Sequence, residues 1–190
     1  MSVLDRARDL LGRELTAYGV TVRITEVEAY GGVTDPASHA YTRTARSEIM
    51  YGPPWRLYVY RIHGHHCANI VTGPSEQAAA VLLRAGEVID GFELARERRG
   101  EVAHEALGRG PGNLARALGI TLADLDTDVR VGPAVVLGDR QSDVAVSEGP
   151  RVGVRRAADR PWRLWATGDP TVSAYRRHAR AESSSEESAG

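Results

Sequence analysis

The chain has 190 residues, of which 42% are hydrophobic and 26% are charged, which is the composition of a soluble globular protein with room for one buried core. No apolar run approaches the ~18 residues of a membrane span, and no basic-then-apolar signal-peptide pattern is present. Because there is a single cysteine, no internal disulfide can form, and we expect a cytoplasmic protein.

The net charge of -1 conceals an uneven distribution of charge along the chain. Residues 151–180 carry eight arginines against two acids, a balance of +6, whereas residues 117–150 carry two arginines against six acids, a balance of -4. A basic face opposite an acidic one would favour the binding of a polyanion. A surface on which solvated charges of both signs are simply mixed explains the same numbers equally well. All 24 basic side chains are arginine, so no side chain can form a Schiff base.

The N-terminal region predicts a helix followed by a strand. Residues 2–12 have capping-box spacing between Ser2 and Asp5 and a glycine at the end, which is typical of a helix. Residues 20–30 (VTVRITEVEAY) have the alternation of a strand, and a regular strand would place Glu28 on the same face as Val22 and Ile24. A carboxylate among apolar and aromatic side chains either lies in solvent at the end of the strand or serves as a catalytic base.

The middle of the chain predicts an ordered loop over residues 31–56 and a strand over residues 56–62, which are aromatic and β-branched. Residues 78–89 (AAAVLLRAGEVI) fit a helix or a strand, and residues 90–100 favour a helix. The sequence GRGPGNLARALGI (108–120) predicts a turn running into a helix, whose start could bind a phosphate or be a plain structural turn.

The C-terminal region predicts two closing strands, RVGVRRA (151–157) and WRLWATG (162–168). The last ten residues, 181–190, are acidic and serine-rich, and we expect them to be disordered. With no internal repeat and no linker, residues 1–180 are expected to form one domain.

The segment VYRIHGHHC (59–67) has some features of a zinc site. Structural zinc sites usually need two ligand pairs, and His65 and His66 would point to opposite faces of a strand. His63 and His65 could share a face, with a third ligand supplied by another histidine or an acid. The spacing therefore disfavours a metal site, and a zinc-dependent hydrolase is kept as an alternative function.

Several motifs occur in a distinctive order: EVEAY (26–30), DPASHAY (35–41), MYGPPWRLYVY (50–60), VLLRA (81–85), GPGNLARALGI (110–120) and RVGV (151–154). In these motifs the sequence resembles the alkyladenine (3-methylpurine) DNA glycosylase family, and the resemblance extends from residue 10 to residue 173. It implies an α+β fold: a single compact domain around a curved, mainly antiparallel β-sheet with flanking helices.

The resemblance also implies an activity. Members of the family flip alkylated or deaminated purines, such as 3-methyladenine and hypoxanthine, out of double-stranded DNA and hydrolyse the N-glycosidic bond. They need no catalytic metal, and we expect no cofactor and a monomer. A DNA-binding protein without catalysis is a further alternative, but a base (Glu28) opposite an arginine (Arg84) argues against it.

Specific roles follow from matching the family's motifs. Glu28 matches the general base that activates water for attack on C1′, and Arg84 matches the arginine that helps to hold this water. The residues that match the base pocket are Tyr30, His39, Tyr60 and Asn69. Two arginines in the loop after His39 are candidate phosphate contacts or solvated side chains: Arg43 and Arg46.

The sequence departs from the family at the expected DNA wedge. His63 stands where many members carry an intercalating tyrosine, and the interval from His63 to Asn69 is one residue shorter than usual. A one-residue change in a strand reverses which side chains face the pocket unless a bulge or loop absorbs it, which affects Asn69 most. Because glycosylases that also cut the strand usually attack with an amine, the absence of lysine predicts a monofunctional enzyme.

Overall fold

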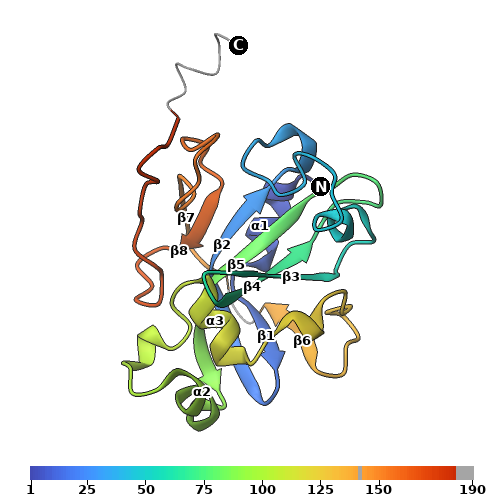
Figure 1. Cartoon of the computed structure of the whole chain (residues 1–190). Coiled ribbons are helices and arrows are strands. Elements are labelled where there is room, and N and C mark those ends of the chain that lie inside the picture. The colour runs from blue at the N-terminus through green and yellow to red at the C-terminus, as the bar shows by residue number, and fades with distance from the viewer. Residues whose placement is uncertain (141–142, 183–190) are drawn as a thin grey trace.

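The computed structural model describes residues 1–140 and 143–182. Within this part of the chain, three α-helices flank one antiparallel sheet of eight strands, which confirms the expected α+β class (Figure 1). Most of the acidic tail expected at residues 181–190 lies outside the described residues, which end at Glu182. None of the described helices is both long and apolar enough to cross a membrane.

The elements follow one another along the chain as helix, strands, helices and strands. The helices are α1 (Val3–Leu10), α2 (Phe92–Arg99) and α3 (Pro111–Leu118). The strands are β1 (Arg13–Ala17), β2 (Val20–Tyr30), β3 (Leu57–Ile62), β4 (His65–Val71), β5 (Ala80–Asp90), β6 (Val135–Arg140), β7 (Val146–Gly149) and β8 (Arg163–Ala166).

The sheet has the strand order β3-β4-β5-β2-β1-β6, and β2 is its centre. One edge of β2 pairs with β5 along nearly its whole length, while the other edge pairs first with β1 and then with β8. Strand β8 in turn pairs with β7. The ambiguous segment 78–89 contributes most of the long strand β5, because its nearly continuous apolar run fits a buried position between two neighbouring strands.

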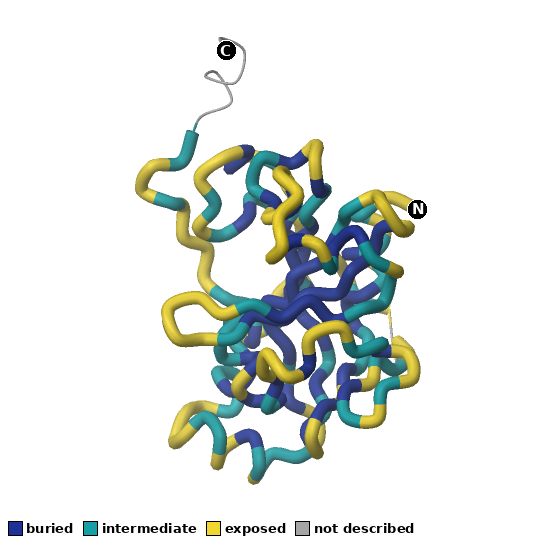
Figure 2. The backbone as a smooth tube through the Cα atoms, turned by 45° about the vertical axis from the view of Figure 1, so that its right-hand side comes forward, coloured by how far each residue is buried: buried dark blue, intermediate teal, exposed yellow. Residues whose placement is uncertain are grey.

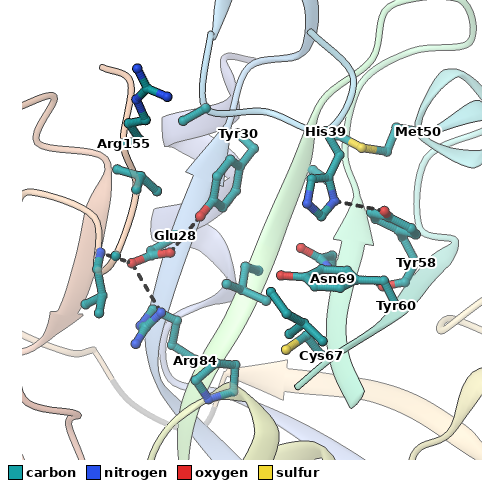
Figure 3. A pocket seen from close by; sticks show the side chains of 18 of the residues that line it. Glu28, Tyr30, His39, Met50, Tyr58, Tyr60, Cys67, Asn69, Arg84 and Arg155 are labelled. Carbon is teal, nitrogen blue, oxygen red and sulfur yellow. Dashed lines mark hydrogen bonds and ion pairs between the residues drawn. The ribbon is translucent and has the colours of Figure 1, made fainter. Parts of the chain in front are cut away.

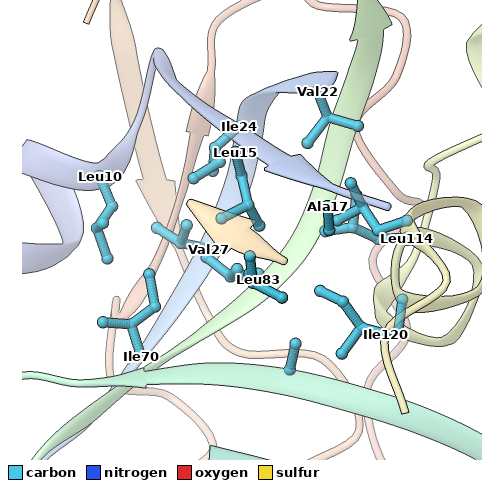
Figure 4. Packing of buried hydrophobic residues seen from close by; sticks show 14 of the residues in the cluster. Leu10, Leu15, Ala17, Val22, Ile24, Val27, Ile70, Leu83, Leu114 and Ile120 are labelled. Atoms are coloured by element: carbon cyan, nitrogen blue, oxygen red, sulfur yellow. The ribbon is translucent and has the colours of Figure 1, made fainter. Parts of the chain in front are cut away.

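The hydrophobic core lies between the sheet and the helices. Leu10 of α1 and Leu114 of α3 pack with Val27 and Leu83 from the central strands (Figure 4). The central strands β2, β4 and β5 are buried along much of their length, and many residues of the connecting loops are exposed (Figure 2). The expected capping box of α1 is present, since Ser2 Oγ accepts from the backbone N–H of Asp5 and the carboxylate of Asp5 accepts from the N–H of Ser2.

A double bulge changes which side chains of β2 face the core. The pairing with β5 shifts between Ile24 and Glu26, which leaves Thr25 as an extra residue on β2, and again between Glu26 and Val27, which leaves Arg84 as an extra residue on β5. The core face therefore carries Ile24 before the bulge and Val27 after it. The expectation that Glu28 shares a face with Val22 and Ile24 was wrong, because a bulge reverses the alternation.

The expected closing strand at residues 151–157 was also wrong. Here the chain turns, with Gly153 at φ +68° and Ala157 at φ +46°, instead of extending alongside another strand. The backbone N–H of Val152 is bound by the carboxylate of Glu28, so it is not available to a strand partner. The second expected strand, in residues 162–168, is confirmed as β8.

Candidate active site

A cavity of about 540 Å³ opens where β2 and β5 meet the β3–β4 hairpin and the loop of residues 151–156. Its lining includes every residue expected in the catalytic pair and the base pocket: Glu28, Arg84, Tyr30, His39, Tyr60 and Asn69. Figure 3 shows Glu28, Tyr30 and Arg84 on one side, facing His39, Tyr60 and Asn69 across the open space.

Glu28 is the fully buried acid of this cavity. Its Oε1 accepts a hydrogen bond from the N–H of Val152 at 2.7 Å, and its Oε2 accepts one from the hydroxyl of Tyr30 at 2.9 Å. Arg84 Nη1 lies 3.4 Å from Oε1. A carboxylate has about four acceptor positions, so these three partners fix its orientation and leave capacity for a water molecule.

Arg84 is held by a second buried carboxylate. Its Nε donates to Oε1 of Glu26 at 3.1 Å and its Nη2 donates to Ser173 Oγ at 3.2 Å. Glu26 also accepts from Arg163 Nε at 2.6 Å and from the N–H of Ser173 at 2.8 Å. Arg84 lies on the same face of β5 as Ala80 and Leu82, the face that lines the cavity, and there it reaches both glutamates.

Tyr30 forms one wall and is supported from behind. The guanidinium carbon of Arg151 lies 4.8 Å from the centre of the Tyr30 ring. Arg151 is fully buried and binds Asp35 through two hydrogen bonds of 2.6 and 2.9 Å. Burial, followed by the charge of Glu28, raises the pKa of Tyr30 well above its ordinary value, so its hydroxyl remains a donor to Glu28.

The opposite wall is an aromatic cluster. The ring centres of His39 and Tyr60 lie 4.7 Å apart with an edge-to-face orientation, and those of Tyr58 and Tyr60 lie 5.6 Å apart. His39 Nδ1 and the Tyr58 hydroxyl share a hydrogen bond of 2.9 Å. Burial, followed by the charge of Arg46, lowers the pKa of His39 to about 4, so the imidazole is neutral at pH 7.

Asn69 forms the floor of the cavity beside this cluster. Its Nδ2 donates to the backbone oxygen of Tyr58 at 3.1 Å, and the residue is only 4% exposed. The register pairs Tyr58 with Asn69, and Tyr60 with Cys67, so all four belong to the cavity side of the hairpin. The amide is thus held in one orientation.

The β3–β4 hairpin absorbs the short interval before Asn69. His63 and Gly64 have φ values of +47° and +82°, as the two central residues of a type I′ turn do. The missing residue therefore shortens the turn, and Asn69 still faces the cavity. His63 lies exposed at the tip, outside the cavity lining, while the neighbouring Ile62 is 45% exposed at the rim.

The two candidate phosphate-binding arginines have different surroundings. Arg43 bonds to the carboxylates of Glu48 and Glu76 and stacks on Tyr51, so its charge is already balanced. The guanidinium of the exposed Arg46 lies 5.0 Å from the centre of the Tyr60 ring. Arg46 is therefore the more available of the two for a phosphate.

The histidine segment provides no metal-ligand set. Among the described residues, no group of three histidine, cysteine or acidic side chains lies close enough to hold a metal ion. A zinc-dependent hydrolase that uses His63 and His65 therefore lacks a third ligand in this part of the chain.

Comparison with known proteins identifies the family. The family model of methylpurine-DNA glycosylase (MPG) matches residues 1–170. The chain belongs to the methylpurine-DNA glycosylase family. A Mycobacterium tuberculosis protein named "Putative 3-methyladenine DNA glycosylase" is 53% identical over 184 residues, which cover 92% of this chain and 90% of the relative. A Mycolicibacterium paratuberculosis protein of the same name is 53% identical over 94% of this chain and 91% of its own length.

As a methylpurine-DNA glycosylase, the protein is a DNA-repair enzyme of base excision repair. The groups that hold Arg84 and Tyr30 in place were not assigned from the sequence. The motifs EVEAY, DPASHAY and RVGV each contribute one of them: Glu26, Asp35 and Arg151. Charged residues inside apolar segments indicate that buried ion pairs are present, but the sequence does not show which acid pairs with which arginine.

Proposed function

We propose that this methylpurine-DNA glycosylase removes alkylated or deaminated purines of the 3-methyladenine and hypoxanthine class from double-stranded DNA. The observation that carries the proposal is the placement of Glu28: a fully buried carboxylate faces, across an open cavity, a wall of aromatic rings. A flipped purine stacked between Tyr30 and the His39–Tyr60 wall would have its sugar within reach of Glu28. Stacking on aromatic rings contributes about 1–3 kcal/mol per base, which offsets part of the cost of unstacking.

In the proposed mechanism, Glu28 accepts a proton from a water molecule as the water attacks C1′. Its two oxygens are fixed by Val152 and Tyr30, so the remaining acceptor position points in a constant direction. The negative carboxylate also stabilises the positive charge that develops on the sugar as the base leaves. Arg84, 3.4 Å from Glu28, orients the same water.

The neutral His39 and the fixed amide of Asn69 would select the base. A neutral imidazole does not repel a cationic 3-methylpurine, and the electron-rich tyrosine rings attract it. Asn69, fixed by Tyr58, would crowd the exocyclic amine of guanine. For a neutral lesion such as hypoxanthine, the leaving base needs a proton in addition.

The decisive test is single-turnover excision from duplexes that carry hypoxanthine or 3-methyladenine. The Glu28→Gln variant should still bind the lesion duplex but should release the base at least about 100-fold more slowly, the usual scale of general-base catalysis. Glu97→Gln, an exposed glutamate on α2, is the matched control and should excise normally. Excision by Glu28→Gln at the wild-type rate would refute the role of Glu28.

The product and the metal requirement separate the alternatives. We propose a monofunctional enzyme, since the chain contains no lysine, and the product should be an intact abasic strand until alkali is added. Excision should persist in EDTA, whereas a zinc-dependent hydrolase would lose activity. A non-catalytic damaged-DNA-binding protein would bind the lesion duplex and release no base.

A further inference from the structure

A second groove lies next to the β3–β4 hairpin, between its tip and helix α3. It has a volume of about 450 Å³ and begins at Gly64, within the same turn that carries His63. Figure 1 shows the tip of the hairpin lying beside α3. The hairpin therefore separates the base cavity, lined by Tyr60 and Ile62, from this second groove.

The second groove is lined by nitrogen-containing side chains. His65 and His66 come from β4, Arg98 from α2 and Arg116 from α3, and none of the described lining residues is acidic. Arg61, exposed on β3, pairs directly with His66 across the hairpin and adds another positive charge at the same end. Such a set of donors without a neutralising carboxylate is suited to an anion.

The groove is built from packed elements. Arg98 donates to the backbone oxygens of Ala117 and Tyr18 at 2.9 and 2.8 Å, so its guanidinium is fixed at the C-terminal end of α3. At the other end of α3, a Cβ atom on Gly112 would lie 2.8 Å from Cβ of His65, so only glycine permits this close approach. Arg116 is exposed between these two anchored ends.

We infer that this groove binds the phosphodiester backbone of the duplex beside the flipped nucleotide. When a damaged base occupies the cavity, the DNA must pass over the hairpin tip, because Tyr60 and Ile62 line the cavity on one side of it. The adjacent backbone then lies over His66 and Arg116, whose guanidinium can bind phosphate through two parallel hydrogen bonds. The inference rests on the proposed action on duplex DNA and adds a second point of attachment to it.

The test is the salt dependence of binding for Arg116→Ala, with undamaged and hypoxanthine-containing duplexes in parallel. A phosphate contact does not read the base, so the Kd should rise by about fivefold for both duplexes, and the slope of log K against log salt should fall in magnitude by about 1. His66→Gln, on a different element, should weaken binding of both duplexes in the same direction. Arg8→Ala removes an equal charge from a surface ion pair with Glu148 and is the matched control, with the wild-type slope expected.

Two outcomes would overturn the inference. One is a salt slope for Arg116→Ala equal to that of the wild type, and the other is a loss of affinity confined to the lesion duplex, which would place Arg116 in base recognition. Circular dichroism and thermal unfolding establish that each variant is folded, and Arg116→Gln replaces Arg116→Ala if the latter is not. A wild-type protein that releases no base would contradict the proposed function, whereas a wild-type protein that releases base alongside an unchanged salt slope contradicts only the groove.

Discussion

Arg84 Nη1 lies 3.4 Å from Glu28 Oε1, and neither side chain is more than 8% exposed. The separation is longer than a strong hydrogen bond, because the closer contact of Arg84 is with Glu26 at 3.1 Å. Glu26 therefore determines where Arg84 stands relative to Glu28. Glu26 is a positioning residue, since it belongs to the network behind the cavity and is absent from the cavity lining.

The first prediction concerns this network. Glu26→Gln should reduce the single-turnover excision rate by about tenfold with little change in lesion binding, because Arg84 loses its ionic anchor while the pocket keeps its shape. A lower excision rate with unchanged affinity for the lesion duplex indicates a positioning role, whereas a general loss of folding would reduce both the rate and the affinity. Glu87→Gln removes a half-buried partner of Arg23 on the same sheet and should leave the rate within about twofold. Equal loss of rate in the two variants would contradict the assignment.

The second prediction concerns the ion pair behind Tyr30. Asp35 and Arg151 are both fully buried, so removing either partner leaves the other as an unpaired buried charge. Arg151→Met should therefore lower the free energy of unfolding by about 3–5 kcal/mol. The double variant Asp35→Asn with Arg151→Met should recover part of this loss, as measured by urea denaturation. The exposed pair Arg8–Glu148 is the control, where Arg8→Ala should change stability by about 1 kcal/mol or less. Strict additivity of the two buried substitutions would show that Asp35 and Arg151 do not act as a pair.

The third prediction concerns the protonation of His39. Since the folded-state pKa is lowered to about 4, the unfolded chain binds more protons between that value and about 6.5, and stability should fall as the pH decreases through this window. The imidazole resonance should therefore titrate well below pH 6 in an NMR experiment. Arg46→Ala removes a neighbouring positive charge and should raise the pKa of His39, whereas Arg130→Ala, whose partner is Asp128, should not. An unshifted titration near pH 6.5 in the wild type would contradict the proposed environment.

The fourth prediction concerns the choice of base. Asn69→Ala removes the fixed amide and its hydrogen bond to Tyr58, so duplexes with guanine or 7-methylguanine should be processed faster relative to hypoxanthine. Loss of the hydrogen bond should also lower stability by about 1 kcal/mol. The measurement is the ratio of kcat/KM values for the two kinds of duplex. A uniform decrease for all bases, with an unchanged ratio, would show that Asn69 supports the pocket without selecting the base.

The fifth prediction concerns the tip of the hairpin. His63 is exposed there, where a wedge would enter the gap left by the flipped nucleotide, and the apolar Ile62 stands next to it. His63→Ala should raise the Kd for lesion duplex, and His63→Tyr should lower it, because a larger ring fills more of the gap. Binding of single-stranded DNA is the control, since it contains no stack to fill. Equal affinities of the two variants for duplex would remove His63 from the role of wedge.

Much of the fold was accessible from local sequence signals. The capping box of α1, the strands β2, β3 and β8 and the helix α2 were all anticipated, because capping and the spacing of apolar residues are properties of neighbouring residues. The segment 151–157 was not, because Val152 pairs with a carboxylate 124 positions earlier in the chain. The strands β1, β6 and β7 were not anticipated either, because each contains residues that are uncommon in strands, such as Glu14, Gly138 and Gly149.

The sequence by itself determined the family and the identities of the candidate residues, because motifs such as EVEAY and VLLRA preserve both residue types and their order. Only the tertiary structure decided how these residues meet. The extra residue Thr25 in β2 takes Glu28 off the core face that Val22 and Ile24 occupy, and the two-residue turn at His63 keeps Asn69 in the cavity. Both effects depend on which strand lies alongside, and a side-chain alternation of period two cannot reveal a shift that is imposed by a neighbouring strand.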